Sequence, residues 1–118
     1  MSNERYVLWP IGDPDVQSPL FAPVISLNVY DNLTIVNMPG LTANTTIDLV
    51  IDPEIREGAR LLINVDQDAT GRDVALGNGF LGDGLIGVPN DRDTIEAVYN
   101  KEDGAFRVTN IHKTTDAA

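Results

Sequence analysis

The stretch from Arg60 to Leu76 constrains the fold more than any other part of this chain. Apolar side chains occupy every second position of its first seven residues: Leu61, Ile63 and Val65. This two-residue period is typical of a β-strand with one buried face. Asp68 and Gly71 then supply turn residues, and the alternation resumes afterwards. The pattern predicts a strand, a turn and a second strand, paired as a hairpin. A lone hairpin is unstable in water, so other strands must cover its apolar face.

Further strand patterns recur along the chain, each bounded by turn residues, at 24–29, 33–38, 45–51, 93–99 and 105–109. The last two are predicted to pair as a hairpin, with Gly104 in the left-handed region. Residues 52–58 are predicted to be a loop with room for one helical turn beginning at Asp52. No stretch shows sustained helical periodicity. About seven short strands with regular turn signals predict a single all-β domain, an antiparallel β-sandwich or jelly roll.

The segment from residue 77 to 89 is rich in glycine, with five of the ten glycines in the chain. It lacks the Lys-Ser/Thr pair of a phosphate-binding loop, and no helical pattern follows it. We therefore expect a long, kinked connection. Its apolar side chains are predicted to be tucked beneath it: Phe80, Leu81, Leu85 and Ile86.

The first 23 residues are predicted to form an extended arm, because prolines recur every four or five positions and proline fixes φ and lacks a backbone donor. The domain proper is expected at 24–111, with a polar tail at 112–118. The arm is nevertheless apolar, and its candidate partner-binding residues are Tyr6, Leu8, Trp9, Pro10, Ile11, Leu20 and Phe21. Two interpretations remain open. The arm either folds back over its own domain and closes a sheet edge, or docks on another subunit with its aromatic side chains as anchors.

Composition excludes several classes of protein. A length of 118 residues suits one domain, and the absence of cysteine excludes disulfides and thiolate metal sites. Eighteen Asp and Glu against eight Lys and Arg disfavour binding to nucleic acid or to anionic lipid. We find neither an apolar run long enough to span a membrane nor a secretion signal.

Candidate sites for chemistry are weak. Asp66, Asp68 and Thr70, followed by Gly71, copy the first half of a calcium loop, but Gly77 stands where the bidentate glutamate should be. We interpret this stretch as a solvated turn and expect neither a metal nor a cofactor. Four carboxylate pairs could act as acid and base only if the fold placed them in a cleft: 13/15, 54/57, 91/93 and 102/103. With His112 as the single histidine and no nucleophile motif, we predict no catalytic residues.

The segment Gln67-Asp-Ala-Thr-Gly-Arg72, the glycine-rich connection after it and the final hairpin at 93–109 together resemble a β-sandwich module of tailed-bacteriophage virion proteins. The resemblance covers roughly residues 30–110. This sequence departs from the pattern at Leu76, where an aromatic residue is common, and the proline-rich arm has no counterpart. The resemblance implies a non-enzymatic structural role in head decoration, a head fibre or a tail component, often as a homotrimer.

The leading hypothesis is therefore a virion structural protein whose arm attaches it to the major capsid protein or another virion subunit, with a homotrimer favoured. The alternative is a carbohydrate- or receptor-binding adhesin domain of a tail component. That function needs exposed aromatic side chains in the distal loops, where the sequence offers Phe80 and Tyr99. A hydrolase on a jelly-roll scaffold is the third and most remote hypothesis.

Overall fold

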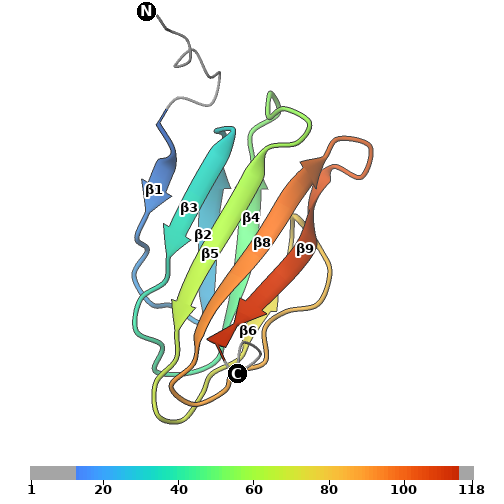
Figure 1. Cartoon of the computed structure of the whole chain (residues 1–118). Helices are drawn as coiled ribbons and strands as arrows, with labels where there is room; N and C mark the ends of the chain where they lie inside the picture. Colours follow the sequence, from blue (N-terminus) through green and yellow to red (C-terminus); the bar gives the residue numbers. More distant parts are fainter. Residues whose placement is uncertain (1–12, 115–118) are drawn as a thin grey trace, which may run out of the picture.

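The structure, a computed structural model, describes residues 13–114, which form nine β-strands and no α-helix (Figure 1). The all-β class predicted from the sequence is confirmed. In chain order the strands are β1 (Asp15–Gln17), β2 (Val24–Val29), β3 (Leu33–Asn37), β4 (Thr45–Ile51), β5 (Arg60–Asp66), β6 (Val74–Leu76), β7 (Phe80–Leu81), β8 (Arg92–Asn100) and β9 (Ala105–Lys113). Within these residues no helix is long and apolar enough to cross a membrane.

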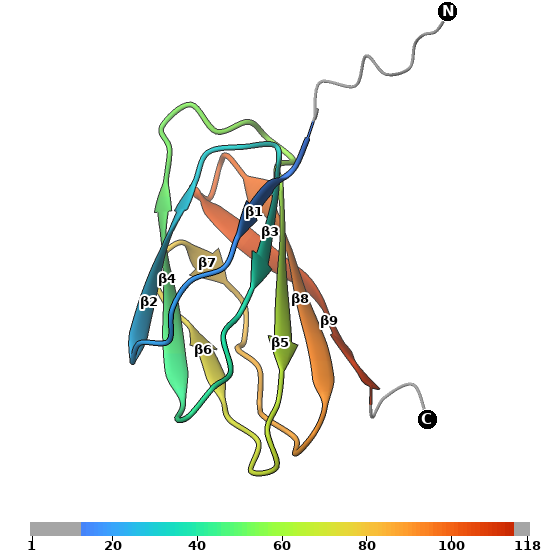
Figure 2. The same ribbon diagram turned by 90° about the vertical axis from the view of Figure 1, so that its left-hand side faces the viewer.

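The strands form two sheets that face one another (Figure 2). One sheet has six strands in the order β1-β3-β5-β8-β9-β7, and the other has three in the order β2-β4-β6. The alternation seen in the sequence decides which side chains point between them. The buried apolar positions of β2 and β5 share this core: Ile25, Leu27, Val29, Leu61, Ile63 and Val65.

Strand direction differs from the expectation of an antiparallel sandwich. The first six strands alternate between the two sheets, so that β1, β3 and β5 lie in one and β2, β4 and β6 in the other. Neighbours within each of these sets run parallel. A parallel pair needs a crossover connection, and here each crossover is a strand of the opposite sheet. The chain therefore winds as a solenoid-like coil before it ends in antiparallel strands.

The prediction that residues 60–76 form a hairpin is wrong, because the two strands do not pair with each other. β5 pairs with β3 and β8, whereas β6 pairs with β4 in the other sheet. The intervening loop crosses from sheet to sheet and is held by the Gln67 side chain. Its Oε1 accepts from the Arg72 amide at 2.6 Å, and its Nε2 donates to the Arg72 carbonyl at 2.9 Å. The strand-turn-strand pattern fixed the local structure but not the partner of each strand.

The C-terminal hairpin is confirmed, since β8 and β9 pair antiparallel across a turn in which Gly104 has φ of 65°. β9 continues to Lys113, two residues into the segment expected to be a polar tail. Residues 52–58 form turns without a helix. The Asp52 side chain accepts from the Glu54 amide at 2.8 Å, and the Asp52 carbonyl accepts from the Ile55 amide at 3.0 Å.

The glycine-rich connection from 77 to 89 contacts both sheets, through β6 in one and β9 in the other. Phe80 and Leu85 are buried as expected, but Leu81 and Ile86 are exposed. The sequence analysis missed β7, which lies within this connection. β7 pairs with β9. At position 79 the structure requires glycine. The residue has φ of 90°, and a Cβ there would lie 2.7 Å from the Leu49 Cβ.

The coil thus has two different ends. The closed end comprises β6, β7 and residues 77–89. The edge of β6 that faces away from β4 is covered there: the Leu85 amide donates to the Val74 carbonyl at 2.8 Å, and the Val74 amide donates to the Leu85 carbonyl at 2.9 Å. The open end comprises β1, β2 and residues 18–23. Among residues 13–114, β2 pairs with β4 alone and β1 with β3 alone.

Candidate partner-binding surface

The described part of the arm belongs to the open end. β1 pairs with β3, and Phe21 packs against the core. These contacts favour the interpretation in which this part of the arm folds back on its own domain. Leu20, by contrast, is 87% exposed. The other predicted arm residues, Tyr6, Leu8, Trp9, Pro10 and Ile11, lie outside the described residues.

Apolar side chains gather in the same region without being buried. Val16 on β1, Val24 on β2 and Tyr30 just after β2 are more than half exposed. The negative charge of Asp15, together with the hydrogen bond that its carboxylate accepts from the Tyr30 hydroxyl, raises the pKa of the Tyr30 phenol and so ties this ring to β1. Exposed apolar residues are ordinary when scattered, but several on one end of a small domain indicate a contact surface.

The backbone edge of β2 is open at this end. The Pro23 and Val29 carbonyls accept from Thr46 and Asp52, so this set of backbone groups faces β4. Because the direction alternates along a strand, the amides and carbonyls of Val24, Ser26 and Asn28 face the opposite edge. One of these groups is covered, since Gln17 Nε2 donates to the Asn28 carbonyl at 2.8 Å. The remaining edge groups find no partner among residues 13–114 in the sheet pairing.

The calcium-like turn uses its carboxylates for other contacts. Asp68 Oδ1 accepts from the Thr70 and Gly71 amides at 2.9 Å each, and Asp68 Oδ2 lies 3.4 Å from Arg72 Nε. The Gly71 amide above all, with the Thr70 amide and the Arg72 charge, lowers the pKa of Asp68. Asp66 turns instead toward Arg92, at 3.7 Å. The oxygens of Asp66 and Asp68 therefore serve the turn and an exposed ion pair, and they do not form a shared cation cage.

Of the carboxylate pairs, the fold brings Asp91 and Asp93 together in the interior. Asp93 is 2% exposed, its Oδ2 lies 3.5 Å from Gln67 Nε2, and its Oδ1 is buried without a hydrogen-bond partner. Burial first, and then Asp91, raise the pKa of Asp93 to about 6. Asp91 in turn accepts from the Thr114 hydroxyl. Both side chains are almost fully buried, at 3% and 2% exposure, so we interpret the pair as part of the packing between the loops and β8. The sequence analysis had named this pair as a candidate without predicting its burial.

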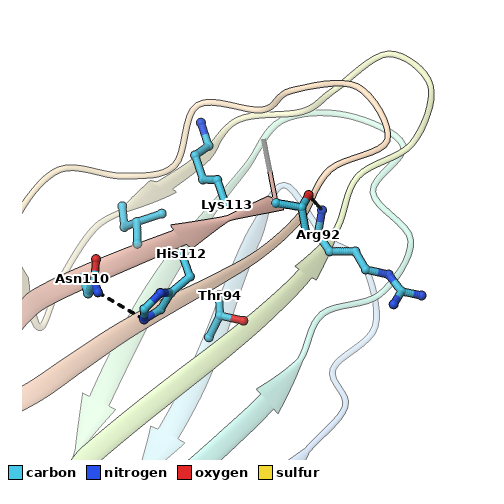
Figure 3. A pocket seen from close by; sticks show the side chains of 7 residues that line it. Arg92, Thr94, Asn110, His112 and Lys113 are labelled. Atoms are coloured by element: carbon cyan, nitrogen blue, oxygen red, sulfur yellow. Dashed lines mark hydrogen bonds between the residues drawn. The ribbon is translucent and has the colours of Figure 1, made fainter. Parts of the chain in front are cut away.

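A polar hollow of about 640 Å³ lies on the outer face of β8 and β9 near the C-terminal end of β9 (Figure 3). Asn110 Nδ2 lies 3.1 Å from His112 Nε2, and the Thr94 hydroxyl donates to Asn64 Oδ1 at 2.9 Å. Lys113 Nζ bonds to the Ile86 carbonyl at 3.0 Å, and Figure 3 shows Arg92 and Lys113 extending in different directions. The hollow is wide and shallow, and its charged groups do not converge on one point.

The two aromatic residues on which the adhesin hypothesis depends are part of the core. Tyr99 and Phe80 are both buried, and the Tyr99 ring packs on Phe106 with centroids 5.3 Å apart. Neither ring is available as a platform for a sugar. Within residues 13–114 no group of three or more His, Asp and Glu side chains is arranged to hold a metal ion.

Comparison with known proteins adds no family to this picture: no protein-family model matches the chain, and no curated protein matches it.

Proposed function

We propose that this chain is a non-enzymatic structural protein of a phage virion, of the capsid-decoration or head-fibre type. It is made in the host cytoplasm and attaches to the major capsid protein or another virion subunit through its N-terminal segment, residues 1–23. The two facing sheets serve as a β-sandwich-like body, and copies associate as a homo-oligomer, with a trimer favoured by the resemblance described above. Adhesion to a glycan is the weaker proposal, because Phe80 and Tyr99 are buried.

The observation that carries this proposal is the apolar open end of an otherwise acidic protein. Leu20 in the arm is 87% exposed, and Val16 on β1 and Val24 on β2 are each more than half exposed. The net charge of −10 works against contacts between acidic faces, whereas residues 16–30 carry no charged side chain, so this stretch is where a partner can approach closely. Burying a leucine side chain in such a contact contributes about 2 kcal/mol.

The test is binding of the purified full chain to phage particles assembled without it. Leu20→Ser should weaken binding about 30-fold, the equivalent of about 2 kcal/mol. Ile86→Ser is the matched control, because Ile86 is 71% exposed but lies at the closed end. The control should bind as the unaltered chain does.

Equal binding by Leu20→Ser and the unaltered chain would contradict attachment through the arm. Failure of the unaltered chain to bind any such particle would contradict the virion role itself. Sedimentation of the same samples tests the oligomer, and a monomer mass at all concentrations, free and on particles, would argue against it.

A further inference from the structure

We propose that two copies of this chain pair with each other through β2, edge to edge and antiparallel. The proposal rests on the homo-oligomer that forms part of the proposed function, and it names the strand at which the copies meet. It is carried by the backbone groups at the β2 edge, by the absence of charge along this stretch and by a hollow beside the strand.

The backbone of β2 offers a regular row of hydrogen-bonding groups. Among residues 13–114, β2 is the outermost strand of its sheet (Figure 2), and the amides and carbonyls of Val24, Ser26 and Asn28 face away from β4. Proteins usually guard such an edge with lysine, proline or a bulge, because it is a template for a strand of another chain. The sequence of β2 has neither charge nor proline, and its pairing with β4 has no register shift. Gln17 bonds to the Asn28 carbonyl, which can accept a second hydrogen bond.

The distribution of charge favours a second copy as the occupant of this edge. With a net charge of −10, two copies repel each other wherever acidic faces meet. Residues 16–30 carry no charged side chain, and β2 lies within this stretch together with exposed Val16 and Leu20. Two copies can therefore approach along β2 without bringing carboxylates of this stretch together. A basic partner would instead be drawn to surfaces that carry carboxylates.

A two-fold axis at Ser26 gives the pairing its register. In an antiparallel pair, opposite residues whose amides and carbonyls face each other exchange both hydrogen bonds. With Ser26 opposite Ser26 of the second copy, Val24 lies opposite Asn28, so all outward-facing residues of β2 are paired. Any other register pairs fewer of them. The contact uses the same patch on both copies and closes with two of them, so a trimer needs a further contact elsewhere.

The side chains on the outer face complement one another in this register. Val24, Ser26 and Asn28 share that face, and Val24 is 54% exposed. A hollow of about 280 Å³ adjoins Asn28, with Tyr30 and Val50 in its lining. Opposite residues of an antiparallel pair project to the same face. Val24 of each copy therefore comes to lie against Asn28 of the other, at the rim of this hollow, where it is covered.

Sedimentation of the full chain from about 1 μM to about 1 mM tests the pairing, because contacts as small as one strand edge are usually weak. Ser26→Asp places two like charges directly opposite each other and should weaken association at least about 10-fold. Ser26→Asn is the matched control, since it has nearly the same size without the charge, and it should associate as the unaltered chain does.

Two results would contradict the pairing, and they differ in what else they contradict. A monomer mass for the unaltered chain at every concentration would overturn both this contact and the homo-oligomer of the proposed function. Equal association of Ser26→Asp and Ser26→Asn would overturn the β2 contact alone and leave the homo-oligomer standing.

A single cysteine locates the axis. The chain has no cysteine, so Ser26→Cys provides one thiol per copy. The Cα atoms of a hydrogen-bonded antiparallel pair lie about 5.5 Å apart, within the range of a disulfide, so oxidation should link two copies. Val50→Cys is the control, because Val50 is 55% exposed on the neighbouring strand and lies away from the axis. Equal yields of linked dimer from the two variants would contradict an axis at Ser26.

Amide hydrogen exchange identifies what covers the edge. The amides of Val24, Ser26 and Asn28 should exchange at least about 10-fold more slowly at high protein concentration than at low concentration. The amides of Ile25, Leu27 and Val29 face β4 and serve as internal controls. Protection of the outward-facing amides that does not depend on concentration would show that a segment of the same chain covers the edge, and the proposal would then be wrong.

Discussion

The two ends of the coil differ in how their core side chains and strand edges are covered. At the closed end, residues 77–89 cover the core with Phe80 and Leu85 and bond to the edge of β6. At the open end, Phe21 covers part of the core, but Leu20, Val16 and Val24 are exposed, and among residues 13–114 no strand pairs with the outer edge of β2. A coil needs a cap at each end, because its terminal strands expose both core and backbone. The closed end is capped within the described chain, so it is expected to carry stability. The open end is expected to carry recognition.

The largest expected difference between the ends concerns side-chain burial. Leu85→Ala should lower the free energy of unfolding by about 2–5 kcal/mol, because Leu85 is 2% exposed and its truncation leaves a cavity. Leu20→Ala removes the same atoms from a side chain that is 87% exposed and should change stability by less than about 0.5 kcal/mol. Urea denaturation monitored by circular dichroism measures both. Similar losses in the two variants would show that the ends do not differ in this way.

The backbone of the closed end gives the next largest effect. Gly79→Ala should lower stability by about 2–4 kcal/mol, since alanine is strained at φ of 90° and its Cβ would crowd Leu49. Gly40→Ala is the control, because a Cβ there meets nothing within 4 Å and its φ is not positive. A neutral Gly79→Ala variant would mean that the connection can move away from β4 at little cost. The measurement is the same denaturation experiment.

A smaller effect comes from the buried carboxyl group of Asp93, on β8, which follows the closed end in the sequence. The pKa of Asp93 is raised to about 6 from the ordinary 3.8, so its protonated form is favoured by folding. Its contribution is therefore fully present below pH 4 and is lost as the pH rises through 6. The loss is up to about 3 kcal/mol, since each pKa unit corresponds to about 1.4 kcal/mol. Asp91 and Lys113 are the charged groups that act on Asp93, and they oppose one another.

The matched variant is Asp93→Asn, which keeps the shape but cannot ionise. Its stability should fall less than that of the unaltered chain between pH 4 and 7, and the difference between the two curves isolates Asp93. Asp68 has the opposite effect on stability, and it acts at lower pH. Because its pKa is lowered by folding, its contribution to stability is lost only as the pH falls below 4. Parallel curves from pH 4 to 7 would show that Asp93 is not the group responsible.

The sequence by itself determined where the strands are and which side chains face the core. The bounds of 24–29, 45–51 and 60–66 agree with β2, β4 and β5, because alternation and turn residues are local properties that any arrangement of strands must satisfy. The final hairpin was also predictable, since its two strands are joined by a short turn in which Gly104 takes a positive φ. β1 was missed because three residues between prolines carry too little pattern, and β7 because it has two residues.

Only the tertiary structure decided how the strands pair. Residues 60–76 read equally well as a hairpin or as an arch between sheets, and the choice rests on contacts with β3, β4 and β8 that lie far away in the sequence. The same holds for the candidate site. The sequence identified an apolar arm. The exposure of Leu20, the packing of Phe21 on the core and the β2 edge without a paired strand among residues 13–114 depend on which strands surround them. Side-chain period is set by each strand alone, whereas an edge exists only in relation to the rest of the sheet.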